Sequence, residues 1–216
     1  GLGGVVMLSL GKSRESEDEH GHGAAAEGAA LKIAMMAAEG IPLEVLSSAE
    51  RKGVSLLAQH GLVKVDGTGM GAMHALTQLV VREQLTDKAD RPSLAAAVVE
   101  ALEAKLNKFD HLKPATYFIG RRYASHAIAA AGHAREWGLV PAQGAAGRGR
   151  GGKGGGGDGL GAGLLKSIGV MCTNAGHFFE HVGGQYGQAE GMYEMSLGCA
   201  VARYGYVHAN TAASYS

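Results

Sequence analysis

The chain has 216 residues, and its 20 Lys and Arg residues balance its 20 Asp and Glu residues, so the formal net charge is zero. This balance gives no general electrostatic attraction to nucleic acid or to an anionic membrane, and we expect neither as a partner. The sequence shows no signal peptide and no long apolar run, which predicts a cytoplasmic protein. Cys172 and Cys199 form no CxxC pair, in agreement with a reducing compartment. Because the first residue is Gly1, we expect a fragment of a longer protein.

Residues 1–27 are predicted to form a lead-in that contains a low-complexity loop of acidic residues and histidines. Two helical patterns follow, at residues 31–39 and 49–60, and Pro42 between them is placed to open a short turn. Gly53 weakens the second helix by about 1 kcal/mol relative to alanine. These helices open a small domain, which we place at residues 28–90.

A strand, a glycine-rich turn and a second strand are predicted next. Residues 62–65 favour an extended chain, and the glycines of residues 66–71 permit a tight turn and a loose hairpin. A closing helix begins near His74. Its predicted apolar stripe consists of Leu76, Leu79, Val80 and Arg82. Short helices, a β-hairpin and a closing helix in this order are typical of a winged helix.

Two longer helical patterns form a connector, residues 91–140, and are expected to pair in antiparallel. The apolar residues of the first recur at i, i+4 spacing and are Leu94, Val98, Leu102 and Leu106. The second pattern covers residues 117–137. His126 and His133 lie two turns apart on one face of it. With no third ligand evident, we interpret them as histidines beside a packing face.

Residues 141–163 are glycine-rich and are predicted to form a flexible linker. Within them, residues 147–154 fit the G-x-x-x-x-G-K part of a P-loop. A P-loop also needs a preceding strand and a hydroxyl for magnesium, and Gly154 supplies no hydroxyl. We therefore expect no phosphate-binding loop here.

The stretches 34–46, 56–63 and 73–78 resemble the winged-helix region of NB-ARC (STAND) NTPases. Met73 and His74 match the Met-His-Asp signature of that family, and Ala75 replaces its aspartate. The resemblance implies that His74 contacts the diphosphate of bound ADP, so that ADP or ATP would be a cofactor of the full-length protein and not of this chain alone. The alternative is a partly buried histidine that caps the closing helix.

Residues 164–170 and 184–193 resemble a tetratricopeptide repeat of the kinesin-light-chain type, with a second repeat starting before residue 216. Small residues let paired helices approach, and aromatic rings fill the space between repeats. The resemblance implies that the packing residues are Gly169, Gly184, Tyr186, Ala189 and Tyr193. A single repeat cannot bury its own apolar face, so we expect residues 164–216 to be marginally stable alone.

The five residues from His177 to His181 match H-x-x-E-H, the zinc motif of inverzincin peptidases. Such enzymes need a distant acidic third ligand and a large catalytic domain, whereas only 35 residues follow His181. We interpret residues 177–184 as an insertion that lengthens the first repeat helix or bulges from its turn. A zinc hydrolase that uses His177, Glu180 and His181 remains an alternative.

The sequence thus predicts a mainly α fold, with a small winged-helix domain followed by antiparallel α-hairpins of tetratricopeptide type. We expect a non-catalytic regulatory and protein-interaction fragment of a STAND-type signalling ATPase, which binds protein partners through its repeats and whose parent protein can oligomerise. No metal and no cofactor is expected in this chain. A winged-helix DNA-binding module is a further alternative, although residues 49–60 offer only Arg51 and Lys52 as cations.

Overall fold

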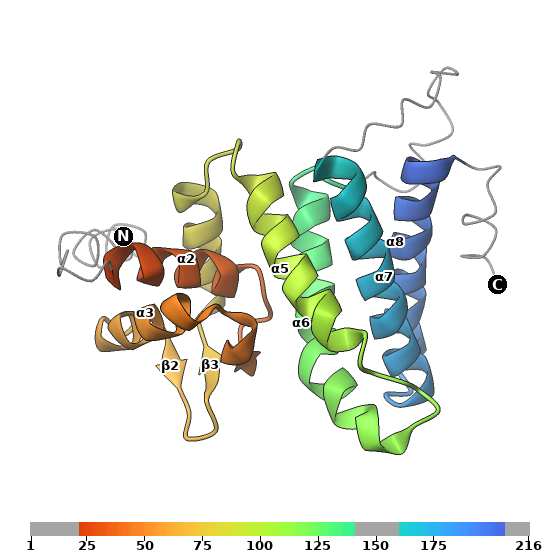
Figure 1. The fold of residues 1–216 in the computed structure, drawn as a ribbon, viewed down its shortest axis with the longest axis horizontal. Coiled ribbons are helices and arrows are strands. Elements are labelled where there is room, and N and C mark those ends of the chain that lie inside the picture. The colour runs from red at the N-terminus through yellow and green to blue at the C-terminus, as the bar shows by residue number, and fades with distance from the viewer. Residues whose placement is uncertain (1–21, 141–159, 206–216) are drawn as a thin grey trace. The chain divides into compact units, whose positions relative to one another are not determined.

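The computed structural model describes residues 22–140 and 160–205 (Figure 1). These residues are mainly helical and contain a three-stranded antiparallel sheet, which confirms the expected helical class. The chain divides into two compact units, residues 1–94 and residues 95–216, and each is described by itself.

Helices α2 (His22–Ala34) and α3 (Ser48–Gln59) pack against each other in the first unit. A methyl group at Gly53 of α3 would lie 2.6 Å from the carbonyl carbon of Ala25, so only glycine permits this approach of the two backbones. The predicted helix at residues 31–39 was wrong in position, because α2 ends at Ala34 and residues 22–27, assigned to the lead-in, are helical.

The start of α3 is fixed by a capping box. Ser47 accepts a hydrogen bond from the Glu50 amide at 3.2 Å, and Glu50 accepts one from the Ser47 amide at 2.8 Å. Lys32 of α2 lies 2.8 Å from the same carboxylate. One glutamate therefore caps α3 and joins it to α2.

The sheet has the strand order β1-β3-β2 and includes the predicted hairpin. Strands β2 (Lys64–Val65) and β3 (Met70–Ala72) pair with Val65 opposite Gly71, and β1 (Ile41–Pro42), which the sequence did not predict, pairs with Ile41 also opposite Gly71. The 3-10 turn η1 (Leu43–Val45) follows Pro42 at the expected place. In the hairpin turn, the Asp66 carboxylate accepts hydrogen bonds from the amides of residues 68 and 70.

The closing helix consists of α4 (Ala75–Val80) and a π-helical turn, η2 (Val81–Leu85). Leu76 and Leu79 are each 46% exposed, so the predicted apolar stripe was wrong at these two positions. The side chains that this segment buries are those of Thr77, Gln78, Val81 and Arg82.

Two of these buried polar side chains bind the end of α2. The Gln78 amide donates hydrogen bonds of 3.1 Å to the carbonyls of Ile33 and Met36, and the Arg82 guanidinium donates one of 2.6 Å to the carbonyl of Ala34. The last carbonyls of a helix have no helical partner and attract cations. Gln78 and Arg82 are therefore buried because the carbonyls at the end of α2 need hydrogen-bond donors. A prediction from hydrophobic periodicity does not include this requirement.

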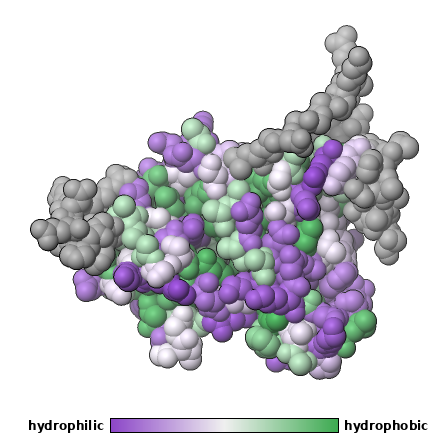
Figure 2. All heavy atoms as spheres, in the orientation of Figure 1, coloured by the Kyte–Doolittle hydropathy of each residue, from purple (hydrophilic) through white to green (hydrophobic). Residues whose placement is uncertain are grey.

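The second unit contains most of α5 (Arg91–Leu106), then η3 (Pro114–Thr116), α6 (Tyr117–Glu136), α7 (Leu160–His181) and α8 (Tyr186–Tyr204). Figure 1 shows the four helices running in alternating directions. The positions of α5 and α6 agree with the two predicted patterns. Figure 2 shows hydrophobic residues near the α5–α6 connection, consistent with Leu112 at 77% and Phe118 at 63% exposure.

Helix α7 packs against both α6 and α8. A methyl group at Gly120 of α6 would overlap the ring of Phe178 from α7, and one at Gly176 of α7 would lie 2.6 Å from the ring of Tyr193 in α8. Each helix pair therefore holds an aromatic ring over a glycine. The sequence predicts a domain boundary between the connector and the repeat at the glycine-rich segment, whereas most of α5 and all of α6, α7 and α8 belong to one compact unit.

Among the described helices, none combines the length and the apolar character that a bilayer crossing requires.

Candidate functional site

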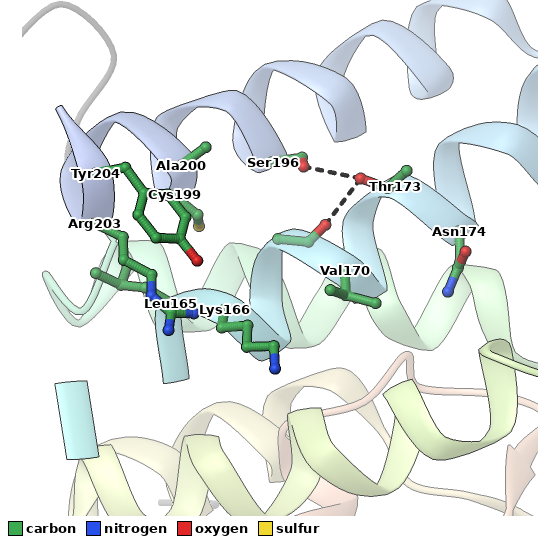
Figure 3. Close-up of a pocket in the computed structure, with 11 residues that line it drawn as sticks. Leu165, Lys166, Val170, Thr173, Asn174, Ser196, Cys199, Ala200, Arg203 and Tyr204 are labelled. Carbon is green, nitrogen blue, oxygen red and sulfur yellow. Dashed lines mark hydrogen bonds between the residues drawn. The ribbon is translucent and has the colours of Figure 1, made fainter. Parts of the chain in front are cut away.

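A groove of about 300 Å³ lies between α7 and α8 (Figure 3). Small and apolar side chains form most of its surface, with two cations and a few neutral polar groups. Its lining residues are Leu165, Lys166, Gly169, Val170, Thr173 and Asn174 of α7 and Ser196, Cys199, Ala200, Arg203 and Tyr204 of α8. Within residues 22–140 and 160–205, no acidic side chain lines it.

The cations of the groove lie toward one end. Figure 3 shows Lys166 and Arg203 near Leu165, with Asn174 toward the other end. The Arg203 guanidinium lies 4.9 Å from the ring centre of Tyr204. Neither Lys166 nor Arg203 forms an ion pair with another described residue. The groove therefore offers positive charge that the described part of the chain does not neutralise.

A polar contact between Thr173 and Ser196 joins the two helices beside the groove. The Thr173 hydroxyl lies 2.9 Å from that of Ser196 and 3.1 Å from the carbonyl of Gly169. Cys172 and Cys199 are buried free thiols. Burial raises the pKa of both thiols, that of Cys199 to about 12, so neither ionises as a reactive cysteine does.

The residues predicted to pack the repeat fall into two groups. Gly169 faces Cys199 and Ser196 in α8, Ala189 is buried, and Tyr193 packs over Gly176. By contrast, Tyr186 is 70% exposed and Gly184 has no atom within 4 Å of an added methyl group. Gly184 instead adopts φ +61° in the α7–α8 turn, a conformation that favours glycine. Gly184 therefore shapes the turn between the two helices, and the role of Tyr186 between successive repeats stays a prediction.

The H-x-x-E-H motif lies in the last turns of α7, so its five residues are part of the first helix of the hairpin. His177 and His181 have their ring centres 6.0 Å apart. A third histidine, His111 of the α5–α6 connection, stacks on His181 at 4.6 Å and lies 5.1 Å from His177. The structure thus brings together three imidazoles, of which the motif contains two.

Electrostatic interactions link this histidine cluster to α8. The Tyr193 hydroxyl donates a hydrogen bond of 2.7 Å to Glu180, whose carboxylate lies 3.7 Å from His181 Nε2. Burial and the hydrogen bond to Glu180 raise the pKa of Tyr193. Burial, followed by the charges of the other two histidines, lowers the pKa of His177. With the side chains as they lie, no three His, Cys, Asp or Glu residues of the described segments are arranged around a metal ion.

His74, the residue matched to the ADP-contacting histidine, caps α4 in the first unit. Its Nδ1 accepts a hydrogen bond of 3.2 Å from the Leu76 amide, and its side chain is exposed. The alternative interpretation of His74, as a cap of the closing helix, predicted this hydrogen bond but expected the histidine to be partly buried.

The two histidines of α6 have the surroundings expected beside a packing face. His126 is 1% exposed, and His133 Nδ1 lies 3.0 Å from a carboxylate oxygen of Glu136.

Several residues of the groove and the cluster were missed by sequence reasoning. Gly120 and Gly176, which lie under aromatic rings next to these sites, were also missed. Their signal in the sequence is that glycine is unfavourable inside a helix, so that its presence there can indicate close packing. No signal in the sequence connects His111 with the cluster, because it lies 66 residues before His177. Lys166 and Arg203 meet only because α7 and α8 are antiparallel. The P-loop-like residues 147–154 lie outside the described residues.

Comparisons with protein-family models, with curated proteins and with solved structures gave no match for this chain.

Proposed function

We propose that this chain is a non-catalytic protein-binding part of a STAND-type signalling ATPase. In this proposal, α2 to η2 and the small sheet form the winged-helix region, and α7 and α8 form a tetratricopeptide-like hairpin. Support comes from the order of helices and strands in the first unit and from the glycine-aromatic contacts of the second. The observation that carries the binding function is the α7–α8 groove.

The groove suits an acidic partner segment that also carries apolar side chains. Its apolar wall gains free energy by removing such side chains from water. Lys166 and Arg203 attract carboxylates, and the guanidinium can accept one in a bidentate manner. The volume of about 300 Å³ accommodates a few side chains, so a short peptide segment is the expected ligand.

Screening of a peptide library against the full chain tests this function. Bound peptides are expected to be enriched in Asp or Glu next to apolar residues. The double variant Lys166→Glu/Arg203→Glu is expected to weaken binding of a selected peptide by about tenfold or more, mainly through lost charge complementarity. The matched control is Arg51→Glu/Lys52→Glu on α3. Equal affinity of both double variants, or enrichment of basic peptides, would exclude the groove as the binding surface.

The same proposal makes His74 the nucleotide-contacting residue of the full-length protein. Because Nδ1 accepts the Leu76 hydrogen bond, the proton of the neutral ring lies on Nε2. That N–H is suited to donate to a diphosphate oxygen. The cap and the contact to ADP therefore use different atoms of one ring.

Two variants separate these roles in a full-length protein that carries its ATPase core. His74→Asn retains a side-chain oxygen to cap α4 but lacks the reach of Nε2, whereas His74→Ala loses both functions. Both are expected to release ADP faster than wild type. If His74→Asn retains ADP as wild type does, His74 is a helix cap only.

A further inference from the structure

The histidine cluster of His111, His177 and His181 joins two segments that are far apart in the chain. His177 and His181 are four residues apart, a spacing that places two imidazoles on one helical face and is used by metal-binding helices. His111 approaches them from the α5–α6 connection. None of the three is needed for the α7–α8 groove, so the proposed protein-binding function leaves the cluster unexplained.

The ring separations match those of a coordination sphere. With metal-nitrogen distances of about 2.1 Å and tetrahedral angles, the centres of two coordinating imidazoles lie about 5 Å apart. The three observed separations are 4.6, 5.1 and 6.0 Å. The three rings therefore lie close to the separations that one ion requires, and their orientation decides whether the nitrogens reach it.

The orientation of the rings differs from that of a loaded site. His111 and His181 lie face to face, with 21° between their planes, so their nitrogens do not converge. The His181 side chain is 43% exposed and is the last residue of α7, so rotation of its ring meets little resistance. The neighbouring Glu180 carboxylate, which is held by Tyr193, places negative charge beside the rings.

We propose that His111, His177 and His181 bind one divalent cation of the zinc class, which ties the α5–α6 connection to the end of α7. Imidazole nitrogens favour zinc, copper and nickel ions over magnesium and calcium, which prefer oxygen. The Glu180 carboxylate, 3.7 Å from His181 Nε2, lies outside this set of ligands and adds negative charge beside it. The ion has a structural role, because it holds together two segments of one compact unit.

Titration of the chelator-treated, tag-free full chain with Co²⁺ tests the proposal, with Zn²⁺ as the competitor. We expect one Co²⁺ per chain, a visible absorption band typical of nitrogen coordination, full displacement by Zn²⁺ and none by Mg²⁺. His111→Gln is expected to weaken binding by more than the roughly 10- to 100-fold that loss of an outer-shell group causes. His60→Gln, at the end of α3 in the other unit, is the matched control and retains wild-type affinity.

A second readout separates this site from binding elsewhere in the chain. Saturating Zn²⁺ is expected to raise the thermal midpoint of wild type and of His60→Gln but not of His111→Gln. Circular dichroism confirms that each variant keeps its helical content. Equal Co²⁺ affinity of His111→Gln and wild type, or the absence of saturable binding, would overturn the proposal.

Discussion

Gln78 and Arg82 are buried because their side chains donate hydrogen bonds to carbonyls at the C-terminal end of α2. Without them the carbonyls of Ala34 and Met36 would lose these donors, and the Ile33 carbonyl would keep only the Met36 amide, 3.1 Å away. A buried carbonyl without a hydrogen bond destabilises a fold by about 1–3 kcal/mol. A polar side chain at this place stabilises the first unit more than an apolar one would.

Exchange of polarity at two adjacent positions of α4 tests this account. Gln78→Leu is expected to destabilise the first unit by about 1–3 kcal/mol, because the Met36 carbonyl loses this donor and the Ile33 carbonyl keeps only the Met36 amide. Leu79→Gln, the matched control, changes an exposed residue and is expected to alter stability by less than about 0.5 kcal/mol. Hydrogen exchange of the α2 and α3 amides measures both. A larger effect at Leu79 would contradict the structure.

Glu50 makes the stability of the first unit depend on pH. Burial raises the pKa of this carboxyl, but hydrogen bonds from Lys32 and Ser47 outweigh burial and leave the pKa below its ordinary value of 4.5. The folded protein therefore binds fewer protons at this site than the unfolded one. The stabilisation is present above pH 4.5 and is lost as the pH falls through the folded pKa.

Replacement of Glu50 by glutamine is expected to remove this contribution while keeping a hydrogen-bonding side chain at the capping position. Between pH 7 and pH 3.5, the protection of α3 amides against hydrogen exchange should fall less in Glu50→Gln than in wild type. The expected difference is about 1 kcal/mol or less, because the ion pair is only partly buried. Parallel pH profiles of the two proteins would show that Glu50 does not contribute.

The crossing of α2 and α3 depends on a glycine that looks unfavourable in the sequence. Intrinsic propensity predicts that Gly53 weakens α3, yet the backbone around Ala25 and Ala26 leaves no room for a methyl group. The free energy that the helix loses at this position is offset by the close contact of the two helices.

Alanine substitutions at two helical glycines separate propensity from packing. Gly53→Ala is expected to destabilise the first unit by about 1–3 kcal/mol, since the helices must move apart. Gly132→Ala in α6, where an added methyl group meets nothing within 4 Å, should stabilise the second unit by about 0.5–1 kcal/mol. Amide exchange measured in each unit gives both values. Stabilisation by Gly53→Ala would disprove the close crossing.

At the scale of elements, the sequence predicted those helices and strands that depend on interactions between residues close in the chain. The hairpin at residues 62–72 and the helices α3, α5 and α6 follow from turn residues, capping and apolar spacing. The end of α2 and the pairing of β1 with β3 were missed, because they depend on Gln78 and Gly71, which lie distant in the sequence. His111 was missed in the histidine cluster for the same reason.

At the scale of the molecule, the second unit joins parts that the sequence separates. Phe178 of α7 packs over Gly120 of α6 and lies 5.9 Å from the ring of Phe109, near the α5–α6 connection. The α7–α8 hairpin therefore buries apolar surface against the connector. Helix α6 therefore covers part of the apolar surface of α7.

The shared core predicts coupled unfolding of α6 and α7. Phe178→Ala is expected to destabilise both by about 3–5 kcal/mol. Trp137, the one tryptophan of the chain, lies at the end of α6 and reports this loss by fluorescence during urea unfolding. Phe118→Ala, the same substitution at an exposed position, should leave the transition almost unchanged. A Trp137 transition that is insensitive to Phe178→Ala would mean that the hairpin folds independently.

The two buried thiols of α7 and α8 make opening of the hairpin chemically observable. Cys172 and Cys199 are at most 2% exposed, and their raised pKa values keep them protonated at neutral pH. A thiol-specific alkylating reagent can modify them only while the two helices are apart, so the labelling rate reports how often α7 and α8 separate. A peptide that occupies the groove should slow this labelling, which allows ligand binding to be followed by mass spectrometry.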